Sequence, residues 1–153
     1  MFHIVLYEPE IPQNTGNIAR TCAATDSILH LVKPLGFRLQ DRYLKRAGLD
    51  YWEHVEVRVH RDFEAVLSCL HPASFYFFTT KAGICYHEKA YQPGDALVFG
   101  PETRGLPDGI LHAYPGRLLK IPQKKQVRSL NLANAVGIVL YEALRQQGFG
   151  GLV

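Results

Sequence analysis

Three separated segments of the chain carry side chains that could bind or act on a ligand. Residues 14–20 read Asn-Thr-Gly-Asn-Ile-Ala-Arg, residues 99–105 read Phe-Gly-Pro-Glu-Thr-Arg-Gly, and residues 128–131 read Arg-Ser-Leu-Asn. Glycine-containing turns expose backbone N–H groups that can bind a phosphate, and arginine binds anionic groups in a bidentate manner. Each segment alone could also be an ordinary turn or helix cap, so their value depends on whether the fold brings them together.

Each of these segments follows an apolar run that is typical of a buried β-strand. The runs are residues 2–7, 96–99 and 117–121. Short strands alternate with helical patterns along the chain, which predicts an α/β fold with a mostly parallel sheet flanked by helices. Because ligands bind at the carboxyl ends of the strands in such folds, we expect the three segments to share one cleft.

The remaining elements are predicted from periodicity and capping residues. Asn14 or Thr15 is expected to cap a helix that runs to residue 26, and Ser129 to cap a final helix over residues 131–147. The apolar face of that final helix could pack against a second copy of the chain. Further strands are predicted at residues 28–32, 55–59 and 74–79, further helices at residues 38–48, 62–70 and 107–113, and polar loops at residues 80–94 and 122–129.

The composition fits a folded module with one domain, residues 1–153. Its hydrophobic fraction of 47% and charged fraction of 20% are typical of globular rather than disordered chains. The three separated cysteines predict no disulfide framework, and the seven histidines lack metal-ligand spacing, so no metal is expected. The chain starts without a leader-like segment and has no apolar run of about 20 residues, so we expect a cytoplasmic protein outside the membrane.

The formal net charge of +3 permits a nucleic-acid partner without requiring one. Basic side chains recur on one face of the predicted helix at residues 38–48, and others lie near the three segments. They could bind RNA phosphates or form a solvated surface. Beside them, Tyr51 and Trp52 could stack on a base, although Trp52 could equally belong to the core. The basic residues are Arg38, Arg42, Lys45, Arg46, Arg58, Arg61, Lys124, Lys125 and Arg128.

The sequence resembles the SpoU branch of the SPOUT superfamily of knotted RNA 2′-O-ribose methyltransferases. Besides the three segments, the resemblance runs through residues 4–17, 34–37, 47–51, 78–81 and 141–143. It implies S-adenosylmethionine as methyl donor, S-adenosylhomocysteine as product, a C-terminal trefoil knot, a homodimer and no separate RNA-binding domain. The match is densest with members that act on the wobble nucleotide, cytidine or uridine, in the anticodon loop of leucine tRNAs.

The resemblance also implies roles for individual residues. The family proposal makes Arg20 the general base, but a guanidinium is not readily deprotonated, so we expect Arg20 to bind the target phosphate and stabilise the developing alkoxide. We expect Asn14, Ser129 and Asn131 to orient the ribose, and Glu102 to orient Arg20. Cofactor contacts, mostly through the backbone, are expected from Phe78, Thr79, Gly100, Glu102, Ile121, Ser129, Leu130 and Asn134.

Three alternatives stay open at the level of sequence. The chain could be a non-catalytic RNA-binding module on the same fold, which would ignore S-adenosylmethionine. It could be an α/β enzyme acting on a small nucleotide, which would turn over without RNA. It could also methylate the ribose of another tRNA or rRNA site.

Overall fold

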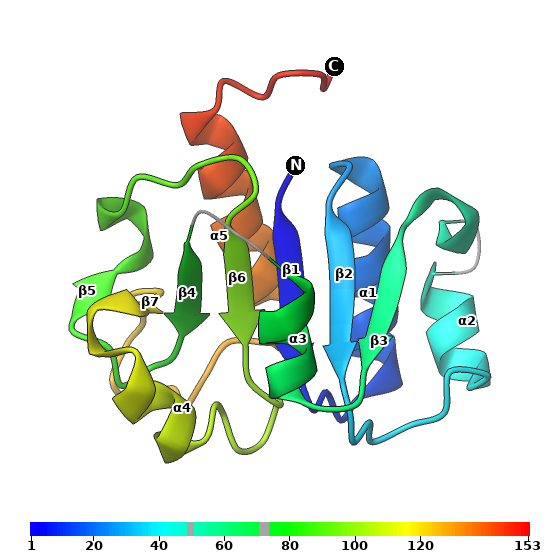
Figure 1. Ribbon diagram of the computed structural model, residues 1–153, viewed down its shortest axis with the longest axis horizontal. Coiled ribbons are helices and arrows are strands. Elements are labelled where there is room, and N and C mark those ends of the chain that lie inside the picture. Colours follow the sequence, from blue (N-terminus) through cyan, green and yellow to red (C-terminus); the bar gives the residue numbers. More distant parts are fainter. Residues whose placement is uncertain (49–50, 71–73) are drawn as a thin grey trace.

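The computed structural model, which describes residues 1–48, 51–70 and 74–153, contains a seven-stranded parallel sheet (Figure 1). The strand order is β3-β2-β1-β6-β4-β7-β5, and each pair of neighbours in it is parallel. The predicted fold class is therefore confirmed. The strands are β1 (His3–Tyr7), β2 (Ile28–Val32), β3 (Val57–His60), β4 (Phe75–Phe78), β5 (Ile84–Cys85), β6 (Ala96–Phe99) and β7 (Leu118–Lys120).

Helices cover both faces of the sheet. One core cluster packs α1 (Pro12–Ala24) and α5 (Leu132–Gln146) against one face, and a second packs α3 (Phe63–Cys69) and α4 (Asp108–Ala113) against the other. In Figure 1, α3 and α4 lie in front of the sheet and α1 and α5 behind it. The central strands are buried on both faces, as their continuous apolar sequences require. The other helical elements are α2 (Arg42–Gly48) and the short 3₁₀ turns η1 (Trp52–His54), η2 (Tyr86–Glu88) and η3 (Pro115–Arg117).

Three helices start at positions other than those predicted. Helix α1 begins at Pro12, which is favourable at a first helical position, so Asn14 and Thr15 lie inside the helix and are buried. Helix α2 begins at Arg42 because the Asp41 carboxylate accepts hydrogen bonds from the next turn. Helix α5 is capped by Asn131, so the predicted Ser129 cap is wrong.

The apolar face of α5 is used inside the fold. Its residues Val136, Val139, Leu140 and Ala143 are completely buried in the main core cluster. The proposal that this face joins two copies of the chain is therefore wrong. The apolar side chains that α5 leaves exposed are instead Ile138 and Tyr141.

The C-terminal segment lies close to the segment that follows β6. Arg128, between β7 and α5, donates to the carbonyl oxygen of Thr103 at 2.9 Å. This proximity is compatible with the trefoil knot, which stays a prediction. Within residues 1–48, 51–70 and 74–153, no helix combines the length and apolar character needed to span a membrane.

Three histidines that looked scattered in the sequence lie side by side on neighbouring strands. His3, His30 and His60 join through ring nitrogens at 3.0 and 2.9 Å across β1, β2 and β3. Burial, followed by repulsion from His3 and His60, lowers the pKa of His30 to about 3. His30 is therefore neutral at physiological pH, and burial also lowers the pKa of His3 and of His60. Among the described residues, no group of three or more His, Cys, Asp or Glu side chains could hold a metal ion.

Candidate functional site

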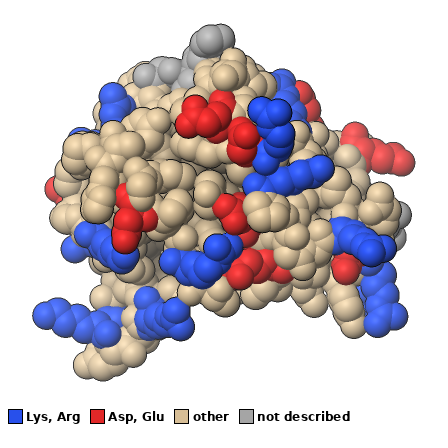
Figure 2. Space-filling view, turned by 60° about the horizontal axis from the view of Figure 1, so that its bottom comes forward, with Lys and Arg blue, Asp and Glu red and all other residues tan. Residues whose placement is uncertain are grey.

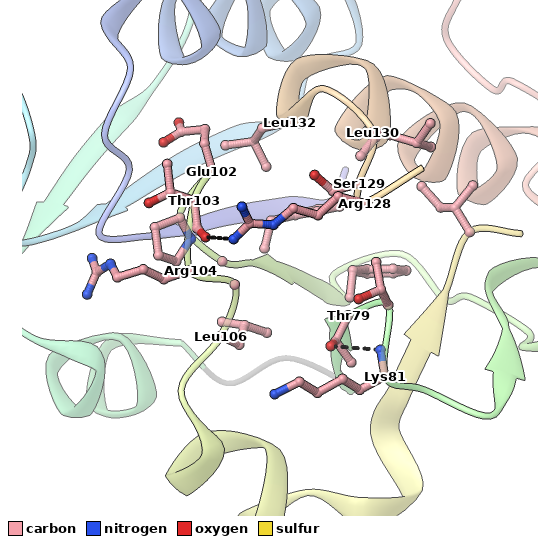
Figure 3. A pocket seen from close by; sticks show the side chains of 18 of the residues that line it. Thr79, Lys81, Glu102, Thr103, Arg104, Leu106, Arg128, Ser129, Leu130 and Leu132 are labelled. Atoms are coloured by element: carbon pink, nitrogen blue, oxygen red, sulfur yellow. Dashed lines mark hydrogen bonds between the residues drawn. The ribbon is translucent and has the colours of Figure 1, made fainter. Parts of the chain in front are cut away.

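A cleft of about 320 Å³ lies at the carboxyl ends of β4, β6 and β7 (Figure 3). This volume falls at the lower end of the range for small-molecule sites. Two of the three sequence segments, together with the end of β4, form its walls. It is lined by Phe78–Lys81, Phe99–Leu106, Ile121, Gln123, Arg128–Leu130, Leu132 and Ala135.

The loop after β6 makes one wall by folding tightly back on itself. A Cβ atom on Gly100 would lie 2.3 Å from the backbone nitrogen of Leu106 and 2.4 Å from the carbonyl carbon of Gly105. Gly105 itself has a φ of +68°, a conformation that favours glycine. Both glycines are therefore required for the shape of this loop, which forms one wall of the cleft.

The base of the cleft is apolar and aromatic. The rings of Phe78 and Phe99, at the ends of β4 and β6, stack with centroids 4.7 Å apart and an interplanar angle of 13°. Both side chains are almost completely buried, and Ile121 and Leu130 add further apolar surface. Such a floor suits a flat heterocycle, whose polar edge can pair with backbone groups of the surrounding loops.

Arg128 reaches across the mouth of the cleft from the third segment to the second. Its guanidinium donates to the Thr103 carbonyl oxygen, and Figure 3 shows its side chain pointing at that loop, whereas Arg104 points outward. Lys81, on the opposite rim, pairs with Asp108 at 3.4 Å but is 69% exposed. The mouth therefore carries cations that an anionic ligand could engage.

The second segment also fixes the start of α1. The Glu102 carboxylate accepts hydrogen bonds from the backbone N–H groups of Glu10, at 2.7 Å, and Ile11, at 3.3 Å. It thereby supplies negative charge at the N-terminus of a helix whose own cap position, Ile11, has no side-chain acceptor. In return, the Glu10 carboxylate accepts from the Thr103 backbone N–H and hydroxyl, and the backbone bond is the main reason why the pKa of Glu10 is lowered.

The first and third segments meet through two asparagine side chains. The Asn131 amide nitrogen donates to the Asn14 side-chain oxygen at 3.0 Å, while the Asn131 oxygen accepts from the Asn134 backbone at 3.2 Å. Asn14 is buried in the first turn of α1 and Asn131 is the N-cap of α5. The pair therefore holds two helix N-termini together beside the cleft.

Arg20 is exposed on α1 and stacks on an aromatic ring. Its guanidinium carbon lies 4.7 Å from the centroid of the Tyr51 ring, which is a favourable cation–π distance. Glu102 binds the backbone before α1, whereas Arg20 stacks on Tyr51. The expected contact between Glu102 and Arg20 is therefore wrong for this structure. Trp52 packs against the main core, which removes it from the residues proposed to stack on a base.

The fold thus brings most of the predicted site residues together. Phe78, Thr79, Gly100, Glu102, Ile121, Ser129 and Leu130 line the cleft, whereas Asn14, Arg20, Asn131 and Asn134 lie outside its lining. Sequence reasoning missed the functions of Glu10 and Thr103 in joining the loops. In the sequence, Tyr51 stood out only as an aromatic residue near basic side chains. That pattern predicted stacking on an RNA base, whereas in the structure Tyr51 stacks on Arg20.

The sheet is parallel, and a cleft with a glycine-containing loop lies at the carboxyl ends of its strands. This combination is typical of α/β proteins that bind a nucleotide or a cofactor. Comparison with known families narrows this class. The model of the SpoU rRNA Methylase family matches residues 1–141, and the chain belongs to this family, the SpoU branch of the SPOUT superfamily.

Individual relatives match along the whole chain. The chain is 51% identical over 154 residues to a tRNA (cytidine(34)-2′-O)-methyltransferase of Methylovorus glucosotrophus, covering 100% of both proteins. It is also 51% identical to the protein of the same name from Escherichia coli K12, covering 98% of that protein.

Solved structures agree with this placement. One described as giving structural insights into the 2-OH methylation of C/U34 on tRNA has a TM-score of 0.92 at 51% identity, and the match covers 97% of both chains. A second, of an RNA 2′-O ribose methyltransferase, has a TM-score of 0.80 at 26% identity; the match covers 95% of this chain and 56% of that one.

Proposed function

We propose that the protein is a tRNA 2′-O-methyltransferase that uses S-adenosylmethionine to methylate the ribose of the wobble nucleotide, cytidine or uridine, in the anticodon loop. The observation that carries this proposal is the 51% identity over the full length of proteins with that named activity. The cleft described above supports it, because seven of the eight residues that the resemblance assigns to the cofactor line this one cleft.

The cleft fits the chemistry of this cofactor. The apolar floor of Phe78 and Phe99 suits an adenine ring, and the Gly100 loop lines the cleft beside it. We assign the cofactor to the lining residues Phe78, Thr79, Gly100, Glu102, Ile121, Ser129 and Leu130, and to Asn134, whose neighbour in sequence Ala135 lines the cleft. When bound, S-adenosylmethionine supplies an electrophilic methyl group.

The protein's own contribution to catalysis is mainly alignment. Holding a ribose 2′-hydroxyl in line with an electrophile supplies about 7–11 kcal/mol of a barrier, whereas a general base supplies about 3–5 kcal/mol. The joined starts of α1 and α5 form a rigid platform on which Asn14, Ser129 and Asn131 orient the ribose. Glu102 acts on this platform indirectly, since it holds the backbone before α1.

Arg20 in this mechanism is an electrostatic and positioning residue. The Tyr51 ring supports its guanidinium from one side and leaves the group exposed for a phosphate. A bidentate guanidinium can bind the phosphate next to the target ribose and stabilise negative charge that develops on the 2′-oxygen. Arg20→Lys is therefore expected to abolish most turnover while S-adenosylmethionine binding survives.

Transfer of a labelled methyl group to anticodon stem-loops that differ only at the wobble nucleotide tests the proposal. We expect label in the stem-loop with a free wobble 2′-hydroxyl and none in a matched stem-loop with a 2′-deoxy wobble nucleotide. A protein that binds S-adenosylmethionine in a titration but labels no stem-loop would overturn the wobble assignment. A protein that ignores the cofactor would instead be an RNA-binding module.

The finer assignments follow from the same proposal. We propose leucine isoacceptors as substrates and a cytoplasmic location, where tRNA is found. We also propose a homodimer whose interface includes the exposed Ile138 and Tyr141 of α5 and the neighbouring Phe149, whose ring lies 6.5 Å from that of Tyr141. Light scattering of Tyr141→Glu tests the interface, since a charge there should shift the mass toward that of a single chain.

A further inference from the structure

A second hollow lies at the same edge of the sheet, between the ends of β2 and β3 and the start of α2. It has a volume of about 580 Å³ and is open to solvent. We call it the basic hollow, because it contains three cations and no acidic residue among the side chains that line it in the described part of the chain. It is lined by Lys33, Pro34, Leu35, Phe37, Arg38, Leu39, Gln40 and Arg61.

The cations of the basic hollow are available to a ligand. Lys33 and Arg38 are exposed, and neither is among the ion pairs found in the described residues. Arg61 pairs with the neighbouring Asp62 at 3.2 Å, but its side chain is 88% exposed, so that pair is weak. Figure 2 shows Lys and Arg side chains along this edge of the molecule, both on the side where α2 lies and on the opposite side.

The loop of residues 8–10 lies between the basic hollow and the cleft. The Gly36 N–H donates to the Pro9 carbonyl oxygen at 2.9 Å, and a Cβ atom on Gly36 would lie 2.7 Å from the Glu10 backbone. On its other side, Glu10 binds Thr103, which lines the cleft. The two hollows therefore lie on either side of one loop, as sites for neighbouring units of one polymer would.

The acidic side chains of this intervening loop are engaged by the protein. Glu10 binds Thr103, and Glu8 faces Arg104 at 3.5 Å. The Glu102 carboxylate accepts a hydrogen bond from the backbone N–H of Glu10, before α1. Their charge is thereby partly compensated, and a polyanion crossing the loop meets hydrogen-bonded carboxylates with cations on both sides.

Apolar and aromatic surface accompanies the cations. Phe37 is half-buried, and Leu35 and Leu39 lie beside it in the same lining. Cationic groups next to an aromatic face are what single-stranded nucleic acid binds, because phosphates pair with the cations and bases stack on the ring. A purely acidic peptide would use the cations but not the ring.

We propose that the basic hollow binds a nucleotide of the RNA loop adjoining the methylated one, with its phosphate on Lys33 and Arg38 and its base against Phe37. This inference rests on the proposed function, since it takes RNA as the substrate. It adds a specificity-determining subsite outside the cofactor cleft.

Fluorescence anisotropy of a labelled anticodon stem-loop, titrated between about 50 and 200 mM salt, tests the subsite. The first variant, Lys33→Gln with Arg38→Gln, should bind about tenfold more weakly and make the slope of log affinity against log salt less negative by about 1.4. The second, Phe37→Ala, should bind about fivefold more weakly with an unchanged slope, because stacking is uncharged. S-adenosylmethionine affinity should stay at the wild-type value in both.

The matched control is Lys89→Gln with Arg145→Gln, which removes the same charge at the opposite edge. Arg145 lies near the end of α5, about 20 Å from the start of that helix at the cleft, and the Lys89 carbonyl oxygen binds the adjacent Gln146. This control should leave both RNA affinity and salt slope unchanged.

The outcomes separate the subsite from the proposed function. An unchanged slope in the Lys33 and Arg38 variant, or an equal change in the control, would overturn the subsite while methylation by the wild type stands. Polyglutamate that competes as strongly as RNA, with no effect of Phe37→Ala, would assign the hollow to acidic peptides instead. A wild-type protein that binds no stem-loop would remove both proposals.

Discussion

Replacing Gly100 by alanine places a single methyl group where the loop after β6 has no room for it. The added Cβ would lie 2.3 Å from the Leu106 nitrogen, roughly 1 Å inside normal contact distance, and the neighbouring atoms are backbone. The loop must therefore open, since a backbone segment cannot rotate away as a side chain can. Forced packing of this kind costs about 1–3 kcal/mol, or about 2–12 °C in Tm for a chain of this size.

The change should also weaken cofactor binding, because the same loop forms a wall of the cleft. Titration calorimetry with S-adenosylmethionine is expected to give a Kd at least about tenfold higher, which corresponds to about 1.4 kcal/mol. The matched control is Gly109→Ala on α4, where an added Cβ meets nothing within 4 Å. There alanine should raise stability by about 0.5–1 kcal/mol and leave the Kd unchanged.

Two results would refute this reasoning. If Gly100→Ala matched the wild type in both Tm and Kd, the tight closure of the loop would not hold in solution. If Gly100→Ala lowered the Tm but left the Kd unchanged, the loop would be structural, and the assignment of Gly100 to the cofactor site would be lost.

Three other predictions follow from contacts around the site and in the core. Tyr51→Leu removes the ring beneath Arg20 and should lower kcat about two- to fivefold. Tyr51→Phe keeps the ring and should retain the wild-type rate. Equal losses in both variants would exclude a role for the ring face. The lowered pKa of His30 means that the unfolded chain binds protons first, so the free energy of unfolding should fall as pH drops below about 6.5, by up to about 1.4 kcal/mol per unit. Urea denaturation of His30→Leu should show a smaller fall between about pH 6.5 and 4, and a parallel curve would contradict this origin. Glu102→Ala should destabilise the protein by about 1–2 kcal/mol in thermal denaturation, because α1 loses its acceptor; unchanged stability with weaker cofactor binding would place the carboxylate on the ligand instead.

Much of the fold was predictable because it rests on local patterns. The strands at residues 28–32 and 96–99 are short apolar runs bounded by polar residues, and the structure reproduces both. Elements with weaker local signals were missed or misplaced. Strand β5 has only two residues inside a polar stretch and exists because it pairs with β7. Residues 38–41 have helical spacing, but Asp41 starts the helix after them.

The site was predictable as a set of segments but not as a set of contacts. Gly100 and Glu102 stood out in a loop after a buried strand, and both line the cleft. The partner of Glu102 could not be foreseen, because the backbone N–H groups that it accepts from lie 91 and 92 residues away in sequence. The same holds for His3, His30 and His60, whose pairing depends on strand order.

The sequence by itself determined the α/β class, the family and the three segments that carry the chemistry, because hydrophobic periodicity, turn residues and motif identity are local properties of the chain. Tertiary structure alone decided that Asn14 meets Asn131, that Arg20 rests on Tyr51, and that a basic hollow lies one loop away from the cleft. These relations depend on which strands become neighbours in the sheet. Strand order brings together residues that are far apart in the chain, and no local pattern encodes it.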